Sequence, residues 1–457
     1  MNNRQFVFDI LKKLEEENVY VSELLTDALR QIQFSGKRDR AFVTRLVEGV
    51  TERKITLDYI IDRFSKKGKK TGKNKISKDI RIMLRMGIYQ IKYMDAVPDR
   101  AAISETVELA REKGYEGLTG YINGLLRTVS GLKEERRLDS FLMSSLEVRY
   151  STPQWLCLFL QDTYGKDIAK KILEDQYMDH DTVIRVNSLK MDTAEMKGLL
   201  EEKNIKFSDG LFAERSIRIQ EYDSVKRLPG YKEGFFSVQD ETSTYAIDRL
   251  GIEPGDFVLD MCSSPGGKSL LAYEISCNNE TCGRIVSRDI SESKLERIQE
   301  NAERLGVPVR VLNPKAGNSP DKDRYQPGIN LEVRDATVSP EKEDKSYIGK
   351  FDKVIADVPC SGLGIIGRKN DIKYHVTKQQ MEELSEMGLS ILKNASRYVK
   401  KGGRICFSTC TINPGENQEV VKKFLESQEG AGFEIKEERT FLQGIDGSDG
   451  FYYCILS

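Results

Sequence analysis

Two of the chain's eight cysteines stand where a nucleophile could act on a bound substrate. Cys360 follows the apolar run at 353–356 in the sequence Asp-Val-Pro-Cys-Ser-Gly, and Cys410 follows the run at 404–408 in Ser-Thr-Cys-Thr. Such short runs, bounded by Pro, Ser, Thr and Gly, predict buried strands that end in loops, and loops often carry functional residues. A cysteine thiolate is a strong nucleophile, and its addition to C6 of a pyrimidine prepares C5 for alkylation. We therefore expect both cysteines to take part in chemistry.

The other reactive residue types narrow the class of protein. The cysteines are too scattered for the dense disulfide framework of a small secreted domain, so reduced thiols are expected. Two histidines in 457 residues disfavour histidine-based catalysis and a histidine-rich zinc site, and we expect no metal. Five further cysteines are predicted to be small buried side chains: Cys157, Cys277, Cys282, Cys406 and Cys454.

A glycine-rich turn follows the apolar run at 257–260. It reads Met-Cys-Ser-Ser-Pro-Gly-Gly-Lys and leads into a helical pattern over 269–275. Glycines let the backbone approach a ligand, and the free N–H groups of a helix start attract polar or anionic groups. The spacing matches neither the G-x-G-x-x-G of nicotinamide enzymes nor a P-loop. What remains is a nucleoside-bearing ligand that needs no pyrophosphate cradle, and S-adenosyl-L-methionine fits that description.

Four successive predicted strands end in an aspartate: Asp260, Asp289, Asp335 and Asp357. The carboxyl ends of parallel strands meet at one edge of a sheet, where open α/β folds bind their ligands. Asp289, at the end of the second strand, occupies the place where such sites bind ribose hydroxyls. The four acids therefore predict a ligand site at this edge.

The elements that must position these residues fall into three regions. Residues 1–140 read as an all-helical domain, in which Ile80, Leu84, Ile88 and Ile91 share one face of a helix. Residues 146–230 read as a small α+β subdomain with a strand at 182–187, and we expect this region, with Arg185 and Asn187, to form part of an RNA channel. Residues 231–457 alternate strands and helices, which predicts a parallel sheet covered on both faces. The Gly/Pro/Asn-rich stretch at 312–329 reads as an insertion loop.

Charge points to a polyanionic partner. The net charge is -1, but the run at 66–81 carries eight cations and one acid, so it attracts nucleic acid or forms a solvated surface loop. No apolar run approaches the roughly 18–20 residues that span a bilayer, and the N-terminus lacks a secretory pattern. A cytoplasmic protein without membrane contact is expected.

Three sequence stretches, VLDMCSSPGGKS, ADVPCSGLG and FSTCTINPGEN, resemble the cofactor motif and the two cysteine motifs of bacterial RNA cytosine-5 methyltransferases. The particular resemblance is to the RsmB (Sun, Fmu) family, and RVNSLK, FFSVQDETS, RKNDIKY and DGSDGFYYC are further matches. The helical region resembles NusB, an RNA-binding antitermination factor. The resemblance implies an all-α NusB-like RNA-binding domain followed by an α/β Rossmann-like class I S-adenosylmethionine-dependent methyltransferase domain.

The resemblance also implies residue roles. Cys410 would attack C6 of a cytosine, Cys360 would assist release of the product, and Asp357 would contact N3. Asp289 would bind the ribose hydroxyls of S-adenosyl-L-methionine, and Asp335 would lie near the adenine. The implied cofactor-binding set is Cys262, Ser263, Ser264, Pro265, Gly266, Gly267, Lys268, Asp289, Asp335 and Asp357.

The implied reaction is 5-methylcytosine formation in 16S ribosomal RNA, at cytosine 967 by the family's name. The substrate would be 16S rRNA or a small-subunit assembly intermediate, with no obligate protein partner evident. Transfer RNA stays open as a substrate, because its cytosine-5 methyltransferases share the catalytic motifs. A non-catalytic RNA-binding ribosome-assembly factor would need no Cys410, Asp357 and glycine turn together. A nucleotide-dependent oxidoreductase would leave the cysteine motifs idle.

Overall fold

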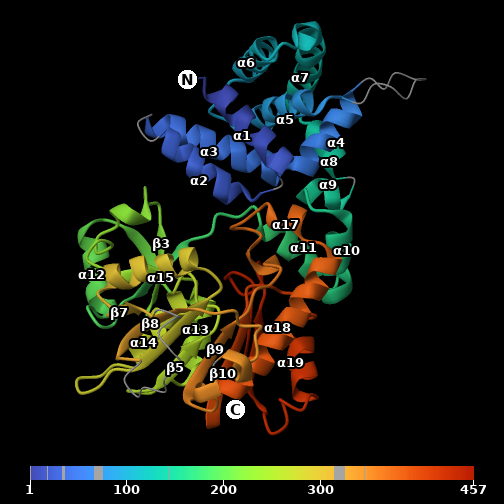
Figure 1. Cartoon of the computed structure of the whole chain (residues 1–457). Helices are drawn as coiled ribbons and strands as arrows, with labels where there is room; N and C mark the ends of the chain where they lie inside the picture. The colour runs from blue at the N-terminus through green and yellow to red at the C-terminus, as the bar shows by residue number, and fades with distance from the viewer. Residues whose placement is uncertain are drawn as a thin grey trace. The chain divides into compact units, whose positions relative to one another are not determined.

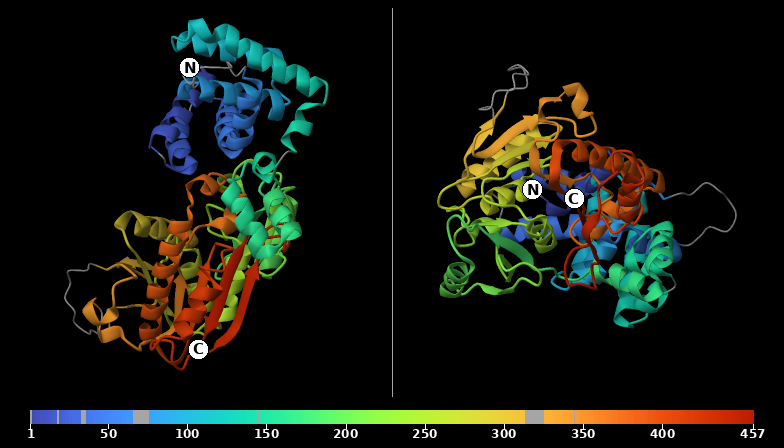
Figure 2. Two further views of the ribbon diagram at one scale, coloured as in Figure 1. Left: turned by 90° about the vertical axis from the view of Figure 1, so that its right-hand side faces the viewer. Right: turned by 90° about the horizontal axis from the view of Figure 1, so that it is seen from below.

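The computed structural model describes residues 2–17, 19–32, 36–65, 76–143, 145–312, 325–343 and 345–457. Its contacts divide the chain into two compact units, shown in Figures 1 and 2. The first unit holds Met1–Gln176 and Arg368–His375, and the second holds Tyr177–Gly367 and Val376–Ser457. Most of the basic run at 66–81 and of the stretch at 312–329 lies outside the described residues.

The first unit is helical, as its sequence predicts. Its core helix, α5 (Lys78–Tyr93), is buried on nearly every side, including the predicted face of Ile80, Leu84, Ile88 and Ile91. The helices around it are α1 (Asn3–Glu17), α2 (Val21–Gln31), α3 (Lys37–Glu52), α4 (Lys54–Phe64), α6 (Asp99–Glu112), α7 (Thr119–Glu134) and α8 (Leu138–Leu142), with a 3-10 turn at Glu116–Leu118. The unit continues through α9 (Leu146–Tyr150), α10 (Gln154–Tyr164) and α11 (Lys166–Asp175), so its boundary lies beyond residue 140.

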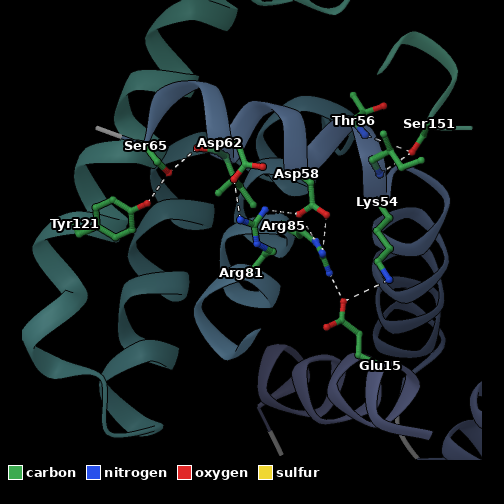
Figure 3. A network of polar contacts seen from close by, with 12 residues as sticks. Glu15, Lys54, Thr56, Asp58, Asp62, Ser65, Arg81, Arg85, Tyr121 and Ser151 are labelled. Atoms are coloured by element: carbon green, nitrogen blue, oxygen red, sulfur yellow. Dashed lines mark hydrogen bonds and ion pairs between the residues drawn. The ribbon is translucent and has the colours of Figure 1, made fainter. Parts of the chain in front are cut away.

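Ion pairs connect three of these helices, as Figure 3 shows. The buried Arg85 of α5 donates to Asp58 of α4 at 2.7 Å and to Glu15 of α1. Arg81, one turn earlier, bridges Asp58 and Asp62. Because Arg85 is nearly buried, removal of either carboxylate would leave a poorly solvated charge, so this network fixes how α1, α4 and α5 pack.

A short segment from the second half of the sequence completes the helical unit. Within Arg368–His375, which includes α17 (Ile372–His375), Asp371 accepts a hydrogen bond from the Val21 N–H at 2.6 Å. The buried Lys373 donates to Gln176 at 2.7 Å, and the Tyr374 hydroxyl contacts the carbonyl oxygen of Glu52 at 2.9 Å. The RKNDIKY stretch is therefore part of the helical core.

The second unit is built on an eight-stranded sheet in the order β11-β12-β10-β9-β5-β6-β8-β7. From β10 to β7 the pairing is parallel, as predicted, whereas β12 pairs antiparallel with β10 and with β11. The strands are β5 (Phe257–Asp260), β6 (Arg284–Asp289), β7 (Val309–Val311), β8 (Gly328–Val333), β9 (Phe351–Asp357), β10 (Val399–Thr409), β11 (Ile435–Phe441) and β12 (Phe451–Leu456).

Helices cover both faces of this sheet. Along β10, Cys406 packs on one face with α13 (Glu241–Leu250), α14 (Gly267–Ile275) and α15 (Glu292–Leu305). Phe407 packs on the other face with α18 (Lys378–Tyr398) and α19 (Gln418–Leu425). Figure 1 shows α18 and α19 side by side along the sheet. The doubly covered Rossmann-like sheet predicted from the strand–helix alternation is confirmed. Short elements complete the unit: α16 (Pro340–Glu343), Lys345–Tyr347 and Leu363–Ile365.

A second, smaller sheet has the antiparallel order β2-β3-β1-β4. Its elements are β1 (Thr182–Val186), α12 (Thr193–Glu202), β2 (Lys206–Asp209), β3 (Ser216–Gln220), the turn Val225–Arg227 and β4 (Phe236–Val238). The placement of Arg185 and Asn187 in an RNA channel is wrong, because both are fully buried. Arg185 pairs with the buried Glu274 of α14 and donates to Gln239 at 2.7 Å, so it joins the small sheet to α14.

The remaining cysteines divide in an unexpected way. Cys157, Cys406 and Cys454 are buried free thiols, as predicted. Cys277 and Cys282 instead form a disulfide across the loop between α14 and β6, which corrects their assignment as buried filler. Among the described residues, no helix is long and apolar enough to cross a membrane.

Candidate active site

The carboxyl ends of β5, β9 and β10 border a cavity of about 240 Å³. Sequence-predicted residues from three separate motifs meet there: the glycine-rich turn, Asp357 and Cys410. The lining residues are Val238, Gln239, Asp240, Thr242, Ser243, Asp260, Cys262, Ser263, Ser264, Pro265, Gly267, Lys268, Asp357, Ile365, Cys410, Asp449, Gly450 and Phe451. Parallel strand topology explains the convergence, because each chain reversal after such a strand falls at the same edge.

The glycine-rich turn is held by the neighbouring strand β6. The Ser263 N–H donates to the Arg288 carbonyl oxygen at 2.8 Å, and the Ser264 N–H donates to the Asp289 carboxylate at 3.0 Å. Gly266 precedes the first residue of α14 with φ of +102°, a conformation that side chains rarely adopt. A Cβ on Gly266 would also lie 2.9 Å from Ile298, so this position requires glycine.

Asp260 offers a hydrogen-bond acceptor that the described residues leave unused. It is buried at the end of β5, where its Oδ2 accepts from the Ser269 hydroxyl at 2.6 Å and its Oδ1 has no partner. Burial raises the pKa of Asp260 to about 7. An unsatisfied buried acceptor beside a glycine cradle fits a ligand that brings a donor, as the ammonium group of S-adenosyl-L-methionine does. The sequence identifies Asp260 as one of the four acids at strand ends, but it indicates no role for Asp260 in cofactor binding.

Asp289 and Asp335 lie outside the lining of this cavity. Asp289 bonds to the turn and pairs with Lys294 at 2.9 Å. Asp335 follows β8 and borders a separate small cavity with Met261, Arg288 and Tyr398, where its Oδ1 accepts from the Thr337 N–H and hydroxyl. Both therefore lie on the β6–β8 side of the glycine-rich turn.

Lys268 and Asp357 form an ion pair at the cavity wall. The Lys268 Nζ lies 2.7 Å from Asp357 Oδ2 and over the Phe451 ring, while Ser408 donates to Asp357 Oδ1 at 2.7 Å. Burial alone would lower the pKa of Lys268, but the Asp357 carboxylate offsets it and the net pKa is raised. Lys268 therefore carries a positive charge at neutral pH, directed at the strand-end carboxylate.

The two predicted cysteines face each other. Cys360 Sγ lies 3.3 Å from Cys410 Sγ, although 50 residues separate them, and neither cysteine forms a disulfide. The hydrogen bond to Cys410, burial and the nearby Glu416 carboxylate raise the pKa of Cys360 well above its usual value. Cys360 therefore keeps its proton, whereas Cys410 is the cysteine that borders the cavity.

Several residues of the cavity wall were not assigned any role from the sequence. They come from the FFSVQDETS and DGSDGFYYC stretches, whose similarity to the family was noted without a function for single residues. Two backbone hydrogen bonds bring the segment 449–451 to the site. The Gly450 N–H donates to the Gly364 carbonyl oxygen at 2.7 Å, and the Gly364 N–H donates to the Cys410 carbonyl oxygen. These contacts join segments far apart in the sequence, and no local pattern reveals them.

Comparison with known proteins agrees with this arrangement. Residues 248–456 match the family model of the 16S rRNA methyltransferase RsmB/F, residues 1–131 match the NusB family, and residues 152–226 match the ferredoxin-like domain of RsmF/B-like methyltransferases. "Probable ribosomal RNA small subunit methyltransferase B" of Bacillus subtilis is 31% identical and covers 99% of this chain and 98% of its own length.

Two further relatives extend the comparison. Ribosomal RNA small subunit methyltransferase B of Vibrio cholerae is 29% identical and covers 100% of this chain and 98% of its own length. The crystal structure of PH0851 shares the fold, with a TM-score of 0.75 at 20% identity over 100% of this chain and 99% of that chain. S-adenosyl-L-methionine is the cofactor of this methyltransferase family. The chain belongs to the ribosomal RNA small subunit methyltransferase B family of RsmB/F 16S rRNA methyltransferases.

Proposed function

We propose that this protein methylates C5 of a cytosine in 16S ribosomal RNA through a covalent bond between Cys410 and C6 of the base. The observation that carries the proposal is the cysteine pair, with Sγ atoms 3.3 Å apart, at the cavity that the glycine-rich turn borders. One thiol can form the adduct while the other assists its removal, and a cytosine-5 methyltransferase needs both steps.

The cofactor would be held by the residues from Cys262 to Lys268, with Asp289 at the ribose hydroxyls and Asp335 near the adenine. When bound, S-adenosyl-L-methionine supplies the methyl group. The free Oδ1 of Asp260 and the glycine backbone at 266–267 support binding at this place. Asp357 stands between the turn and the cysteines, because it pairs with Lys268 and accepts from Ser408 of β10.

Different residues of the chain carry out the separate bond changes and proton transfers of this reaction. Cys410 forms the S–C6 bond as a thiolate, and the electron pair displaced toward C5 makes C5 the nucleophile. Asp357 contacts N3, where negative charge develops, through a proton that the carboxyl group shares with or passes to this nitrogen, because cytosine N3 carries no hydrogen of its own. Lys268 and Ser408, which donate to the two oxygens of Asp357, hold the group in place. After transfer, Cys360 assists the loss of the C5 proton to solvent, the electron pair of the C5–H bond restores the C5–C6 double bond, the S–C6 bond breaks and Cys410 leaves as a thiolate. The raised pKa of Cys360 supports Cys410 as the nucleophile, because a thiol that keeps its proton is a weak nucleophile.

The RNA must present an unstacked base to reach the sheet edge. We propose that the NusB-like helices and the basic run at 66–81 supply phosphate contacts that do not depend on base identity. The small α+β subdomain would add to this RNA surface. We propose cytosine 967, the position that the family resemblance implies, as the target, in free 16S rRNA or a small-subunit assembly intermediate in the cytoplasm; membership of the 16S rRNA methyltransferase family supports the class of RNA.

The test is methyl transfer from labelled S-adenosyl-L-methionine to unmodified 16S rRNA, with unmodified transfer RNA in parallel. The expected product is 5-methylcytosine at one position of the 16S rRNA and none in transfer RNA. Label on transfer RNA alone would move the substrate to the tRNA class. RNA binding without transfer to either RNA would favour the non-catalytic assembly factor.

A further inference from the structure

A buried glutamate lies directly behind the cysteine pair. Glu416 is 2% exposed, and no Lys or Arg among the described residues forms an ion pair with it. Burial raises its pKa, although hydrogen bonds from Ser361 and Asn413 oppose that shift. A carboxyl group held in the interior by neutral donors alone is costly, because each lost hydrogen bond leaves a poorly solvated charge. Such a group indicates a role that an apolar side chain could not fill.

All the donors to Glu416 come from the two cysteine loops. Its Oε2 accepts from the Ser361 N–H at 2.7 Å, and Ser361 directly follows Cys360. Its Oε1 accepts from the Ser361 hydroxyl at 2.6 Å and from the Asn413 side-chain amide at 2.9 Å. Glu416 therefore binds the loop after β9 and the loop after β10 at the same time.

A chain of hydroxyl groups extends the connection to the other cysteine. The Ser361 and Thr411 oxygens lie 2.8 Å apart, and Thr411 directly follows Cys410. Because Ser361 gives its one hydroxyl proton to Glu416, Thr411 must be the donor in this contact. Both residues are buried, so water cannot replace these bonds. The order Thr411 to Ser361 to Glu416 thus joins the residues that follow the two cysteines.

We infer that Glu416 is a positioning residue that sets the spacing of Cys360 and Cys410. This inference rests on the proposed function for its catalytic consequence, but the spacing itself is measurable without methyl transfer. Glu416 is absent from the cavity lining and from the partners of the glycine-rich turn, so its role does not include cofactor binding. We call the hydrogen bonds from Ser361 and Asn413 to Glu416 the Glu416 clamp. Loss of this clamp would separate the thiol that forms the adduct from the thiol that assists its release.

Glu416→Gln is the discriminating substitution. Glutamine keeps the size of the side chain but replaces one acceptor oxygen with an NH₂ donor, which faces either the Ser361 N–H or the Ser361 hydroxyl. In the first case the backbone bond to the Cys360 loop is lost; in the second the Ser361 hydroxyl can turn and accept, but the NH₂ meets the Asn413 NH₂ and the bond to the Cys410 loop is lost. The matched control is Glu419→Gln, the same change on an exposed glutamate three residues away.

The spacing is read by oxidation of the full-length protein with diamide. The two thiols form a disulfide, and their two protons and two electrons reduce the diazene to a hydrazine. Mass spectrometry of the Cys360–Cys410 peptide then gives the rate. We expect this rate to fall about tenfold or more in Glu416→Gln and to stay unchanged in Glu419→Gln, since displacement near 1 Å has effects of this size on reacting pairs.

Kinetics supply the second readout. In Glu416→Gln we expect kcat for methyl transfer to fall about 10- to 100-fold, while KM for S-adenosyl-L-methionine stays within twofold. Covalent protein–RNA adduct should accumulate, because release stalls before addition does. If Glu416→Gln does not fold, Ser361→Ala, which keeps the backbone bond to Oε2, should show the same changes at smaller size.

The outcomes separate the two ideas. Slower disulfide formation together with lower kcat supports the clamp and the proposed function. If disulfide formation is slower in Glu416→Gln but the wild-type protein transfers no methyl group, the clamp is supported and the proposed function is refuted. An unchanged disulfide rate with unchanged kcat in folded Glu416→Gln overturns the clamp.

Discussion

The site has two halves that are built in different ways. The cofactor half, formed by the turn Cys262–Lys268 with Asp260 and Asp289, is local and relies on backbone N–H groups and glycine. The cysteine half, formed by Cys360 and Cys410 with Glu416, is assembled from side chains of distant loops. Asp357 joins the two halves, through Lys268 of the turn and Ser408 of β10.

Because the two halves are built differently, we expect substitutions to change cofactor affinity and the chemical steps on the RNA separately. A backbone cradle is complete before the RNA arrives and should govern cofactor affinity. Side chains that only meet across loops should govern the lifetime of the covalent intermediate. This distinction would be wrong if a substitution in the cofactor half changed the lifetime of the covalent intermediate, or if one in the cysteine half changed cofactor affinity.

Asp357→Asn tests the residue shared by the two halves and should have the largest effect. We expect kcat to fall by about 10²–10⁴-fold, because the amide cannot pass a proton to N3 as a carboxyl group does. The dissociation constant for S-adenosyl-L-methionine, measured by calorimetry, should change less than tenfold. A larger change in affinity than in kcat would assign Asp357 to the cofactor half.

Asp260→Asn probes the cofactor half through pH. The folded protein holds the Asp260 proton more tightly than the unfolded chain, whose carboxyl pKa is about 3.9, because burial raises the folded value to about 7. The stability linked to that proton is complete below about pH 4 and is lost as pH rises through 7. We expect urea unfolding of the wild type to lose about 2–3 kcal/mol between pH 5 and pH 8 relative to Asp260→Asn. Parallel curves for the two proteins would contradict the assignment.

Gly266→Ala should weaken cofactor binding and leave the cysteine half intact. The residue would be strained at φ of +102° and would press on Ile298, at a cost of about 1–3 kcal/mol, or roughly 10- to 100-fold in affinity. The control is Gly402→Ala, which has φ of +79° with open space around it, away from the site. Equal cofactor affinity in the two variants would show that the cradle does not depend on Gly266.

Asp335→Asn should have the smallest effect. Asp335 borders a separate small cavity and is already bonded to Thr337, so we expect an affinity loss of up to about tenfold and no change in adduct lifetime. Equilibrium dialysis with labelled S-adenosyl-L-methionine measures the first, and denaturing gels measure the second. Unchanged affinity would remove Asp335 from the cofactor half.

The sequence predicted the strand, turn and helix that form the cofactor half, because this information is local. Strand, glycine turn and helix follow one another within 257–275, and the alternation of apolar runs predicted the parallel sheet that brings Asp357 and Cys410 to the same edge. The helical pattern of α5 likewise needed only spacing along one element.

Long-range contacts could not be predicted in this way. The expectation that Arg185 forms part of an RNA channel fails because its partner Glu274, which makes its burial tolerable, lies 89 residues away in the sequence. The segment 368–375 joins a different compact unit from its neighbours in sequence. Glu416 carried no signal of its own, because its partner Ser361 lies 55 residues before it.

The most direct test of the account is covalent trapping with 16S rRNA and S-adenosyl-L-methionine. Wild type, Cys360→Ala and Cys410→Ala are mixed with the substrates and resolved on denaturing gels. We expect a protein–RNA adduct that accumulates in Cys360→Ala, turns over in wild type and is absent from Cys410→Ala, which also forms no 5-methylcytosine. An adduct trapped by Cys410→Ala and not by Cys360→Ala would contradict it and reverse the roles of the two cysteines.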